Sequence, residues 1–221
     1  MKGVSIDGLH SYGDFGLHLI NENNCIPPPV PKTHFVKVPG RSGDLDLSEA
    51  LTGRCEYENR LITLQFGGMR RDWPYFLDEF ISLYHGKKID QLLFDYDQAH
   101  YFTGRASIRG DFEKTGRLGK FTMDVECEPY RYDLTPKTAS ASLSGGSSTK
   151  TITISNSEIP IVPEFNAAIT TGRTMTVTFN GTAYSLRNGD QVIPDISFPS
   201  SGSLRFTGYG TVTVTARGGR L

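Results

Sequence analysis

The sequence predicts a mainly β protein of two domains, with one α-helix in the first domain and an antiparallel β-sandwich in the second. Short segments that alternate apolar and polar residues recur along the whole chain, and this is the pattern of half-buried strands. A single stretch, residues 72–86, places apolar residues at helical spacing instead. The composition changes near residue 136, beside a run of Ser, Thr, Gly and Ala. We therefore expect one domain over residues 1–136 and another over residues 137–221.

Length and charge limit the classes of function. The 221 residues are enough for two modest domains, each with its own core. The net charge of −1 offers no general attraction for nucleic acid or for anionic membrane surfaces. No apolar run approaches the roughly 20 residues that would cross a bilayer, and the N-terminal residues lack the apolar block of a secretory signal. We expect a chain that folds and assembles in a cytoplasm, without a membrane partner.

The distribution of charge supports the domain boundary. Residues 1–136 hold 16 Lys and Arg against 20 Asp and Glu, whereas residues 137–221 hold 7 against 4. The first domain is therefore acidic and the second is basic.

Cysteine and histidine spacing gives no sign of a metal or cofactor. Cys25, Cys55 and Cys127 are odd in number and far apart, without a CxxC pair, so we expect three reduced and largely buried thiols. The five histidines show neither an HExxH motif nor another tight spacing. The carboxylate pairs Asp95 with Asp97 and Glu126 with Glu128 could each share one face of a strand. Such pairs do not establish the separation across a cleft that a glycosidase needs.

Within the first domain, strands are expected on both sides of the helix. The segment NRLITLQF places Ile62, Leu64 and Phe66 on one face. The segment KFTMDVECEPYRY directs Phe121, Met123, Val125 and Cys127 inward, and Lys120, Thr122, Asp124, Glu126 and Glu128 outward. The second of these strands is therefore expected to carry an acidic outer face.

The helix in RRDWPYFLDEFISLYHGKK has identifiable ends. Asp72 can cap its start, and Gly86 can end it. Lys87 and Lys88 would follow the negative end of the helix dipole. We expect its apolar face to pack onto a sheet, and this face consists of Phe76, Leu77, Phe80, Ile81 and Tyr84.

The second domain is expected to contain strands alone. The Ser- and Gly-rich residues 134–150 suggest a linker that leads into the first strand. Asn180-Gly181 lies between two alternating segments, and this pair favours the type I′ turn of a β-hairpin. Regularly spaced short strands over about 80 residues favour an antiparallel sandwich.

The most distinctive short stretch is VPGRSGDLDLSEALTG, residues 38–53. As a calcium loop it fails, because Glu49 occupies the obligatory glycine position and Cys55 the position of the bidentate glutamate. It lacks the Lys-Ser/Thr end of a phosphate loop and the G-x-S-x-G order of a nucleophile elbow. What remains is a pair of turns that present charges beside leucines, which suits a contact between subunits.

The order of motifs resembles the distal tail protein (Dit) family of siphophages, the hub of the tail tip or baseplate. The resemblance begins with VPGRSGDLDLSEALTG, YENRLITLQF and DWPYFLDEFISLYHGKK, and continues with LLFDYDQAHYFTGRASI and GRLGKFTMDVECEPYRYDL. At the C-terminal end, LRFTGYGTVTVTARGGRL looks like the close of the second domain of the same family.

This resemblance implies a structural protein and no enzyme. The first domain would be a tail-tube-like β-sandwich that forms a hexameric ring, and the second a galectin-like β-sandwich. Such rings join the tail tube protein to the tail-tip (tail-associated lysin-like) protein and leave a central channel through which DNA passes. Larger members hold receptor-binding proteins through insertions that this chain lacks. The implied location is the virion tail tip, assembled in the cytoplasm of the bacterial host.

Two sets of residues are candidates for these contacts. We expect Arg41, Asp44 and Asp46 to lie near a neighbouring subunit, with Arg60 as a charge partner. The acidic side chains Asp124, Glu126 and Glu128 would line the channel, because like charge keeps DNA from adhering. An ordinary solvated strand face explains the second set equally well.

Two rival functions remain. A carbohydrate-binding accessory protein that recognises host-surface glycans would need aromatic side chains that stack on sugars. The second domain has no tryptophan and just two tyrosines, Tyr184 and Tyr209. A tip-associated hydrolase would need a catalytic constellation that the spacing of residues does not reveal.

Overall fold

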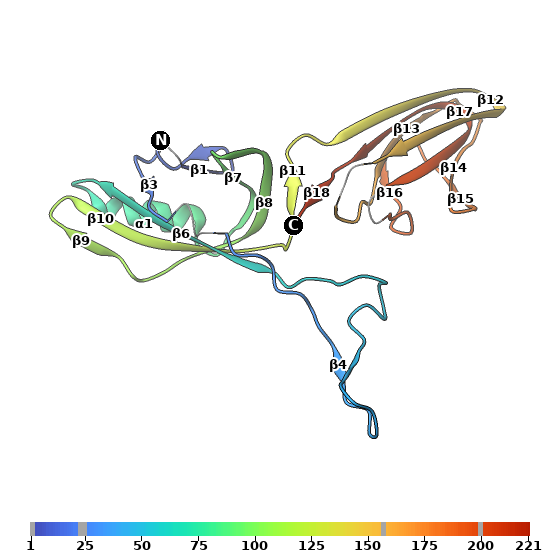
Figure 1. The fold of residues 1–221 in the computed structure, drawn as a ribbon. Coiled ribbons are helices and arrows are strands. Elements are labelled where there is room, and N and C mark those ends of the chain that lie inside the picture. Colours follow the sequence, from blue (N-terminus) through green and yellow to red (C-terminus); the bar gives the residue numbers. More distant parts are fainter. Residues whose placement is uncertain (1–2, 22–25, 156–157, 199–200) are drawn as a thin grey trace. The chain divides into compact units, whose positions relative to one another are not determined.

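The structure is a computed structural model that describes residues 3–21, 26–155, 158–198 and 201–221. It divides into two compact units, of which unit 1 comprises residues 1–131 with Leu221 and unit 2 comprises residues 132–220. The division falls five residues before the boundary that composition suggested. The chain is mainly β with a single helix among the described residues, and the predicted fold class is confirmed in these terms (Figure 1). None of the described helices is long and apolar enough for a transmembrane span.

The elements follow one another along the chain as shown in Figure 1. Those up to and including the strand that contains the unit boundary are β1 (Val4–Ile6), β2 (Leu9–His10), β3 (His18–Leu19), β4 (Phe35–Val36), β5 (Leu45–Asp46), β6 (Arg60–Met69), α1 (Trp73–Tyr84), β7 (Lys88–Phe94), β8 (Asp97–Ile108), β9 (Glu113–Thr115), β10 (Leu118–Cys127) and β11 (Arg131–Asp133). The remainder are β12 (Lys137–Ile154), β13 (Glu164–Ile169), β14 (Met175–Phe179), β15 (Thr182–Ser185), β16 (Gly189–Val192), β17 (Gly202–Ala216) and β18 (Gly219–Arg220).

Unit 1 is built on an antiparallel sheet in the order β2-β1-β7-β8-β10-β6-β3, with α1 against it (Figure 1). Its central pair is β6 with β10, aligned from Arg60 opposite Cys127 to Met69 opposite Leu118. The apolar residues predicted to face inward on both strands are all buried, which confirms the period-2 assignment. They are Ile62, Leu64, Phe66, Phe121, Met123, Val125 and Cys127.

The helix differs from its prediction in detail. Asp72 occupies the N-cap position, but its side chain makes no capping hydrogen bond and instead pairs with Arg70 at 3.3 Å. Ile81, expected on the buried face, is 41% exposed. The buried face of the helix is formed by its aromatic side chains, because these bury the most area against the sheet. It consists of Trp73, Phe76, Phe80 and Tyr84.

One expected outward residue of β10 is buried. Thr122, which the alternation pattern predicts on the solvent face, has an exposed fraction of only 6%. The residues that follow β8 contact it: the backbone N–H of Thr122 donates to Asp111 Oδ1 at 3.0 Å, and its carbonyl accepts from Arg109 N–H at 2.9 Å. A long-range contact of this kind has no signature in a local alternation pattern.

Unit 2 corrects the linker prediction. Most of the Ser- and Gly-rich stretch belongs to β12, which pairs antiparallel with β17 from Lys137 opposite Ala216 to Ile154 opposite Gly202. Small residues alternate there as in any strand, with Ala141 and Leu143 buried. The composition of the stretch resembles that of a linker and conceals this alternation.

The long strand β17 organises the rest of unit 2. Its second edge pairs first with β14, ending at Met175 opposite Gly208, and then with β13, starting at Ile169 opposite Gly210. The two glycines at this change of partner have φ angles of +133° and +129°, which glycine tolerates best. The predicted hairpin at Asn180-Gly181 is confirmed, since both residues have positive φ and connect β14 to β15.

The structure agrees in part with the expectation of three reduced and largely buried thiols. Cys127 is buried and Cys55 is half-buried, and neither forms a disulfide. Burial raises the pKa of Cys127 to about 12, so this thiol stays protonated at neutral pH. Cys25 lies outside the described residues.

Candidate functional site

The distinctive stretch belongs to a thin two-stranded segment, residues 31–57, which we call the arm (Figure 1). An isolated bridge between Pro31 and Tyr57 closes its base, and β4 pairs with β5 beyond that bridge. All residues of the arm are described, and none is buried. Leu51 is 99% exposed. Two strands without a core have little stability of their own. The apolar side chains of the arm would be covered only if the arm packed against another surface.

The tip of the arm holds three of the four predicted contact residues. Arg41, Asp44 and Asp46 are exposed, and glycines 40 and 43 have φ angles of +81° and +77° in the predicted turns. The Asp46 carboxylate accepts hydrogen bonds from the Ser48 hydroxyl at 2.5 Å and from the Ser48 N–H at 2.9 Å. These bonds lower the pKa of Asp46, so its charge is already engaged within the arm.

The fourth residue, Arg60, lies beyond the base of the arm and is only 5% exposed. Its guanidinium donates to the carbonyl of Pro27 at 3.5 Å and to that of Pro129, and its Cζ lies 5.3 Å from the centre of the Phe102 ring. Burial is the main cause that lowers the pKa of Arg60. Arg60, expected from the sequence to be a charge partner for the arm, is thus a buried cation.

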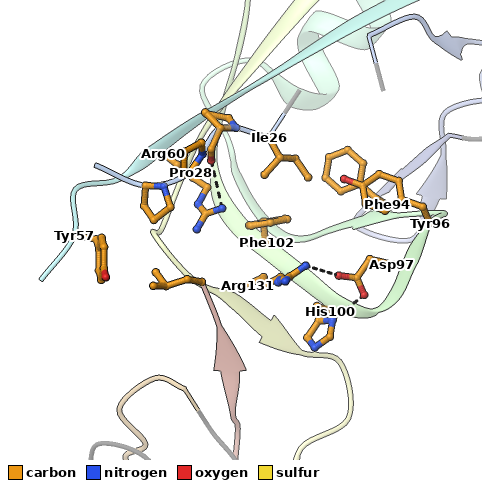
Figure 2. A pocket seen from close by; sticks show the side chains of 13 residues that line it. Ile26, Pro28, Tyr57, Arg60, Phe94, Tyr96, Asp97, His100, Phe102 and Arg131 are labelled. Atoms are coloured by element: carbon orange, nitrogen blue, oxygen red, sulfur yellow. Dashed lines mark hydrogen bonds and ion pairs between the residues drawn. The ribbon is translucent and has the colours of Figure 1, made fainter. Parts of the chain in front are cut away.

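Arg60 lines a cavity of about 570 Å³ in unit 1 (Figure 2). Prolines, aromatic rings and charged groups share its wall. The lining consists of Ile26, Pro27, Pro28, Pro29, Tyr57, Arg60, Phe94, Tyr96, Asp97, His100, Phe102, Arg131 and Leu221. Residues 26–29, which precede the arm, and Tyr57 at its base form one part of the wall, and β8 with the end of β7 forms another.

A second arginine and a single carboxylate occupy the same cavity. Arg131 donates to Asp97 Oδ2 at 3.0 Å, and the other oxygen of Asp97 lies 2.7 Å from His100 Nδ1 (Figure 2). Burial would raise the pKa of Asp97, but the bond from His100 and the charges of His100 and Arg131 outweigh it and lower the pKa. Asp97 therefore stays ionised and holds both partners in place.

This pairing predicts a pH dependence of stability. The unfolded pKa of aspartate is about 3.9, and the folded value of Asp97 is lower. The unfolded chain then binds more protons in this range, so the contribution is present above about pH 4 and is lost as pH falls through the folded pKa. We expect Asp97→Asn to remove this part of the acid sensitivity.

Urea unfolding of both proteins between pH 3 and 6 would test this. Asp78→Asn, on the exposed side of α1, is the matched control. An equal loss of stability on acidification in wild type and Asp97→Asn would contradict the assignment.

Sequence reasoning missed Asp97, His100 and Arg131 as partners in one site. Arg131 lies 34 residues from Asp97, and only the fold brings the two together. The pair Asp95 and Asp97, which could have shared a strand face, enters two different networks. Asp95 contacts His10 Nε2 at 3.2 Å and accepts from the Gly3 N–H at 2.6 Å. No group of side chains suited to a metal ion occurs among the described residues.

The acidic strand β10 is less uniformly acidic than predicted. The side chain of Asp124 is 16% exposed, and Arg109 contacts it through Nε at 2.6 Å and through a second nitrogen at 3.0 Å. Glu126 and Glu128 are exposed, and Glu126 accepts a bond from Asn59 Nδ2 at 3.2 Å. The charge of Asp124 is therefore compensated, and the two glutamates carry the acidic character of this face.

The comparisons with known proteins identify the fold. No model of a known protein family matches the sequence, and no curated protein matches it. Among solved structures, the chain matches the crystal structure of the Dit protein of phage SPP1, described as a paradigm of the hub adsorption apparatus in phages that infect Gram-positive bacteria. The TM-score is 0.64 at 11% sequence identity, and the match covers 100% of both chains. Over its whole length, this chain therefore has the fold of a phage distal tail hub protein.

Proposed function

We propose that this chain is a structural component of a phage tail tip, where six copies form a ring that joins the tail tube to the tip or baseplate. The observation that carries the proposal is the match to the SPP1 Dit fold over the full length of both chains. DNA would pass through the centre of the ring without specific binding. The partners would be other copies, the tail tube protein and a tail-associated lysin-like protein, with receptor-binding proteins as a further class.

Exposed apolar groups on unit 1 support self-association. The arm presents Phe35 and Leu51 to solvent. On the sheet, Ile20, Met69 and Leu118 are also exposed, and they surround a groove at the glycines of β6. Exposed apolar side chains that lie together on a surface commonly mark a contact with another protein. In this proposal Arg41, Asp44 and Asp46 contact a neighbouring subunit, and Arg60 fixes the base of the arm.

The channel assignment rests on β10. Glu126 and Glu128 are exposed and would face the passing DNA, with Asp124 as a more buried member of the same strand face. Repulsion between these carboxylates and phosphate would keep the DNA mobile.

The glycan-binding alternative receives less support. Arg173 lies over the Tyr209 ring at 4.7 Å, and the ring edge lies against Gly146. Tyr184 packs against the core of unit 2. The two tyrosines that could stack on a sugar are thus already in contact with protein.

Negative-stain electron microscopy of the purified protein, with and without its tail-tip partner, tests the proposal. We expect rings with six-fold symmetry and a central opening. Labelled antibodies should bind the distal end of the tail in virions. Particles that stay monomeric with the partner, or antibody along the whole tail, would contradict the proposal.

The predicted contact between the arm and a neighbouring subunit can be tested by measuring the mass of the assembly in solution, under conditions in which the wild-type protein forms rings. We expect Asp44→Ala with Asp46→Ala to shift the assembly toward monomers. The Asp44 carboxylate would no longer pair with a neighbour, and the bonds by which Asp46 holds Ser48 within the arm would be lost. The control is Asp78→Ala with Glu79→Ala, which changes the net charge equally on exposed positions of α1. An unchanged oligomer in the arm variant would count against the contact.

A further inference from the structure

The side chains that line the cavity at Arg60, here called the arginine-lined cavity, carry more positive than negative charge. Its lining side chains include two guanidinium groups, Arg60 and Arg131, and one carboxylate, Asp97. Within the described part of the chain, neither the Nε of Arg60 nor that of Arg131 has a hydrogen-bond partner, although both atoms are buried. A buried cation without a full set of partners is costly. The cavity is therefore suited to an anion.

The rest of the lining indicates what kind of anion. The Phe102 ring lies against the guanidinium of Arg60, and Tyr57 and Pro28 lie on the other side of this guanidinium (Figure 2). Pro27 and Pro29 also line the cavity. A ligand that fits this surface would combine a carboxylate with apolar side chains next to it. A carboxylate also matches the fork of a guanidinium, with which it can form two parallel bonds.

This chain presents that combination at the tip of its own arm. The segment Asp44-Leu45-Asp46-Leu47 alternates carboxylates with leucines. The Asp46 carboxylate accepts hydrogen bonds from Ser48. Asp44 is exposed, and among the described residues its side chain has no such bond within the arm. Asp44 is the carboxylate that is available to a new partner.

An arm cannot enter the cavity of its own copy. Tyr57, at the base of the arm, lines the cavity itself. The strand pairing carries the tip away from this base by about 20 Å, at roughly 3.3 Å per residue from Pro31 to the turn after β4. The partner must therefore be a second molecule.

We infer that the arm tip of one copy inserts into the arginine-lined cavity of the next copy, where the Asp44 carboxylate pairs with Arg60 and Arg131. The inference rests on the proposed function and specifies one contact of the ring. Tip and cavity are different surfaces, so the contact is head-to-tail, and repeated contacts of this kind close a ring when the rotation permits. Arg131 would then bind two carboxylates, Asp97 of its own copy and Asp44 of the neighbour.

A peptide binding experiment tests this contact without requiring a ring. The receptor is the full-length protein with Asp44→Asn, whose own tips would no longer compete for the cavity. The probe is a fluorescein-labelled peptide of residues 38–51, followed by fluorescence anisotropy. We expect saturable binding that weakens with salt, and at least about tenfold weaker binding of the same peptide with Asp44→Asn. A peptide with Glu49→Gln loses the same charge and should bind like the unmodified one.

Changes in the receptor complete the test. Arg60→Lys and Arg131→Lys keep the charge but lose the fork, so each should weaken binding of the unmodified peptide several-fold. Arg117→Lys, at an exposed position outside the cavity, should leave binding unchanged. Circular dichroism and Trp73 fluorescence verify that each variant is folded.

Several results would overturn the inference. Equal affinity for the unmodified and Asp44→Asn peptides would do so, as would an absence of saturation up to about 1 mM, which is the limit of weak specific binding. Six-fold rings formed normally by the Asp44→Asn protein would also refute this contact and leave the proposed hub function intact. Asp44-dependent binding of the peptide by a protein that never forms rings would instead support the contact and count against the hub.

Discussion

Replacing Gly210 by alanine is expected to unfold unit 2 while unit 1 remains folded. The φ angle of Gly210 is +129°, and a Cβ built at this position would lie 2.2 Å from the carbonyl oxygen of Ala168 and 2.9 Å from Cα of Ile169. Both are backbone atoms of β13, which pairs with β17 at this point, so they cannot move aside as a side chain could. Strained backbone of this kind costs about 1–3 kcal/mol, and overpacking adds a similar amount.

The summed cost of backbone strain and overpacking is a large fraction of the free energy of unfolding of a typical domain, which is about 5–15 kcal/mol. Far-UV circular dichroism should lose part of its β signal. Trp73 is the only tryptophan, lies in unit 1 and is fully buried, so its fluorescence reports on unit 1 alone. We expect its emission and its unfolding midpoint to be unchanged.

A neighbouring glycine provides the control for this variant. Gly145 pairs with Gly208 across β12 and β17, and its φ is not in the left-handed region. A Cβ there meets only Cβ of Ser148, at 3.9 Å. Gly145→Ala should change stability by no more than about 0.5 kcal/mol. Wild-type stability of Gly210→Ala, or joint loss of the Trp73 signal, would contradict the prediction.

The same variant separates the proposed roles of the two units. The arm and the arginine-lined cavity both belong to unit 1. If they form the contact between copies, Gly210→Ala should keep Asp44-dependent association although unit 2 is unfolded.

Local chemistry made much of the fold predictable. Alternation of apolar residues identified Ile62, Leu64 and Phe66 as one buried face, because a strand on a core repeats every two residues. Asn180 and Gly181 marked their hairpin, because few residues other than asparagine and glycine accept positive φ in succession. In both cases the information lies within a few adjacent residues.

The candidate site was only partly predictable, because its members are distant in sequence. Asp44 and Asp46 stood out as charges within a short turn-rich stretch. Arg60 was predicted as a charge partner for the arm. Arginine is seldom buried, so its position between the carbonyls of Pro27 and Pro129 could not be read from the sequence. Asp97 and Arg131 meet only after β8 and the end of unit 1 are in place, and their spacing in the sequence carries no signal of a shared cavity.

The second large effect is expected at Gly119, where alanine should destabilise unit 1. A Cβ at this position would lie 2.4 Å from Cε2 of Trp73 and 2.8 Å from its Nε1. The indole cannot easily withdraw, because its Nε1–H donates to the carbonyl of Arg117 at 2.8 Å and aromatic rings pack around it. Overpacking of such a core costs about 1–3 kcal/mol, and loss of the buried hydrogen bond adds about 1–3 kcal/mol.

We therefore expect the unfolding midpoint of Gly119→Ala to fall and the emission of Trp73 to shift to longer wavelength, as water reaches the indole. The β signal of unit 2 should persist, since its core is formed by its own residues. Gly110→Ala is the matched control, because a Cβ at Gly110 meets nothing within 4 Å and φ there is outside the left-handed region. Emission and midpoint equal to those of the control would mean that Gly119 does not set the position of Trp73. The packing of α1 on the sheet would then depend on the aromatic rings alone.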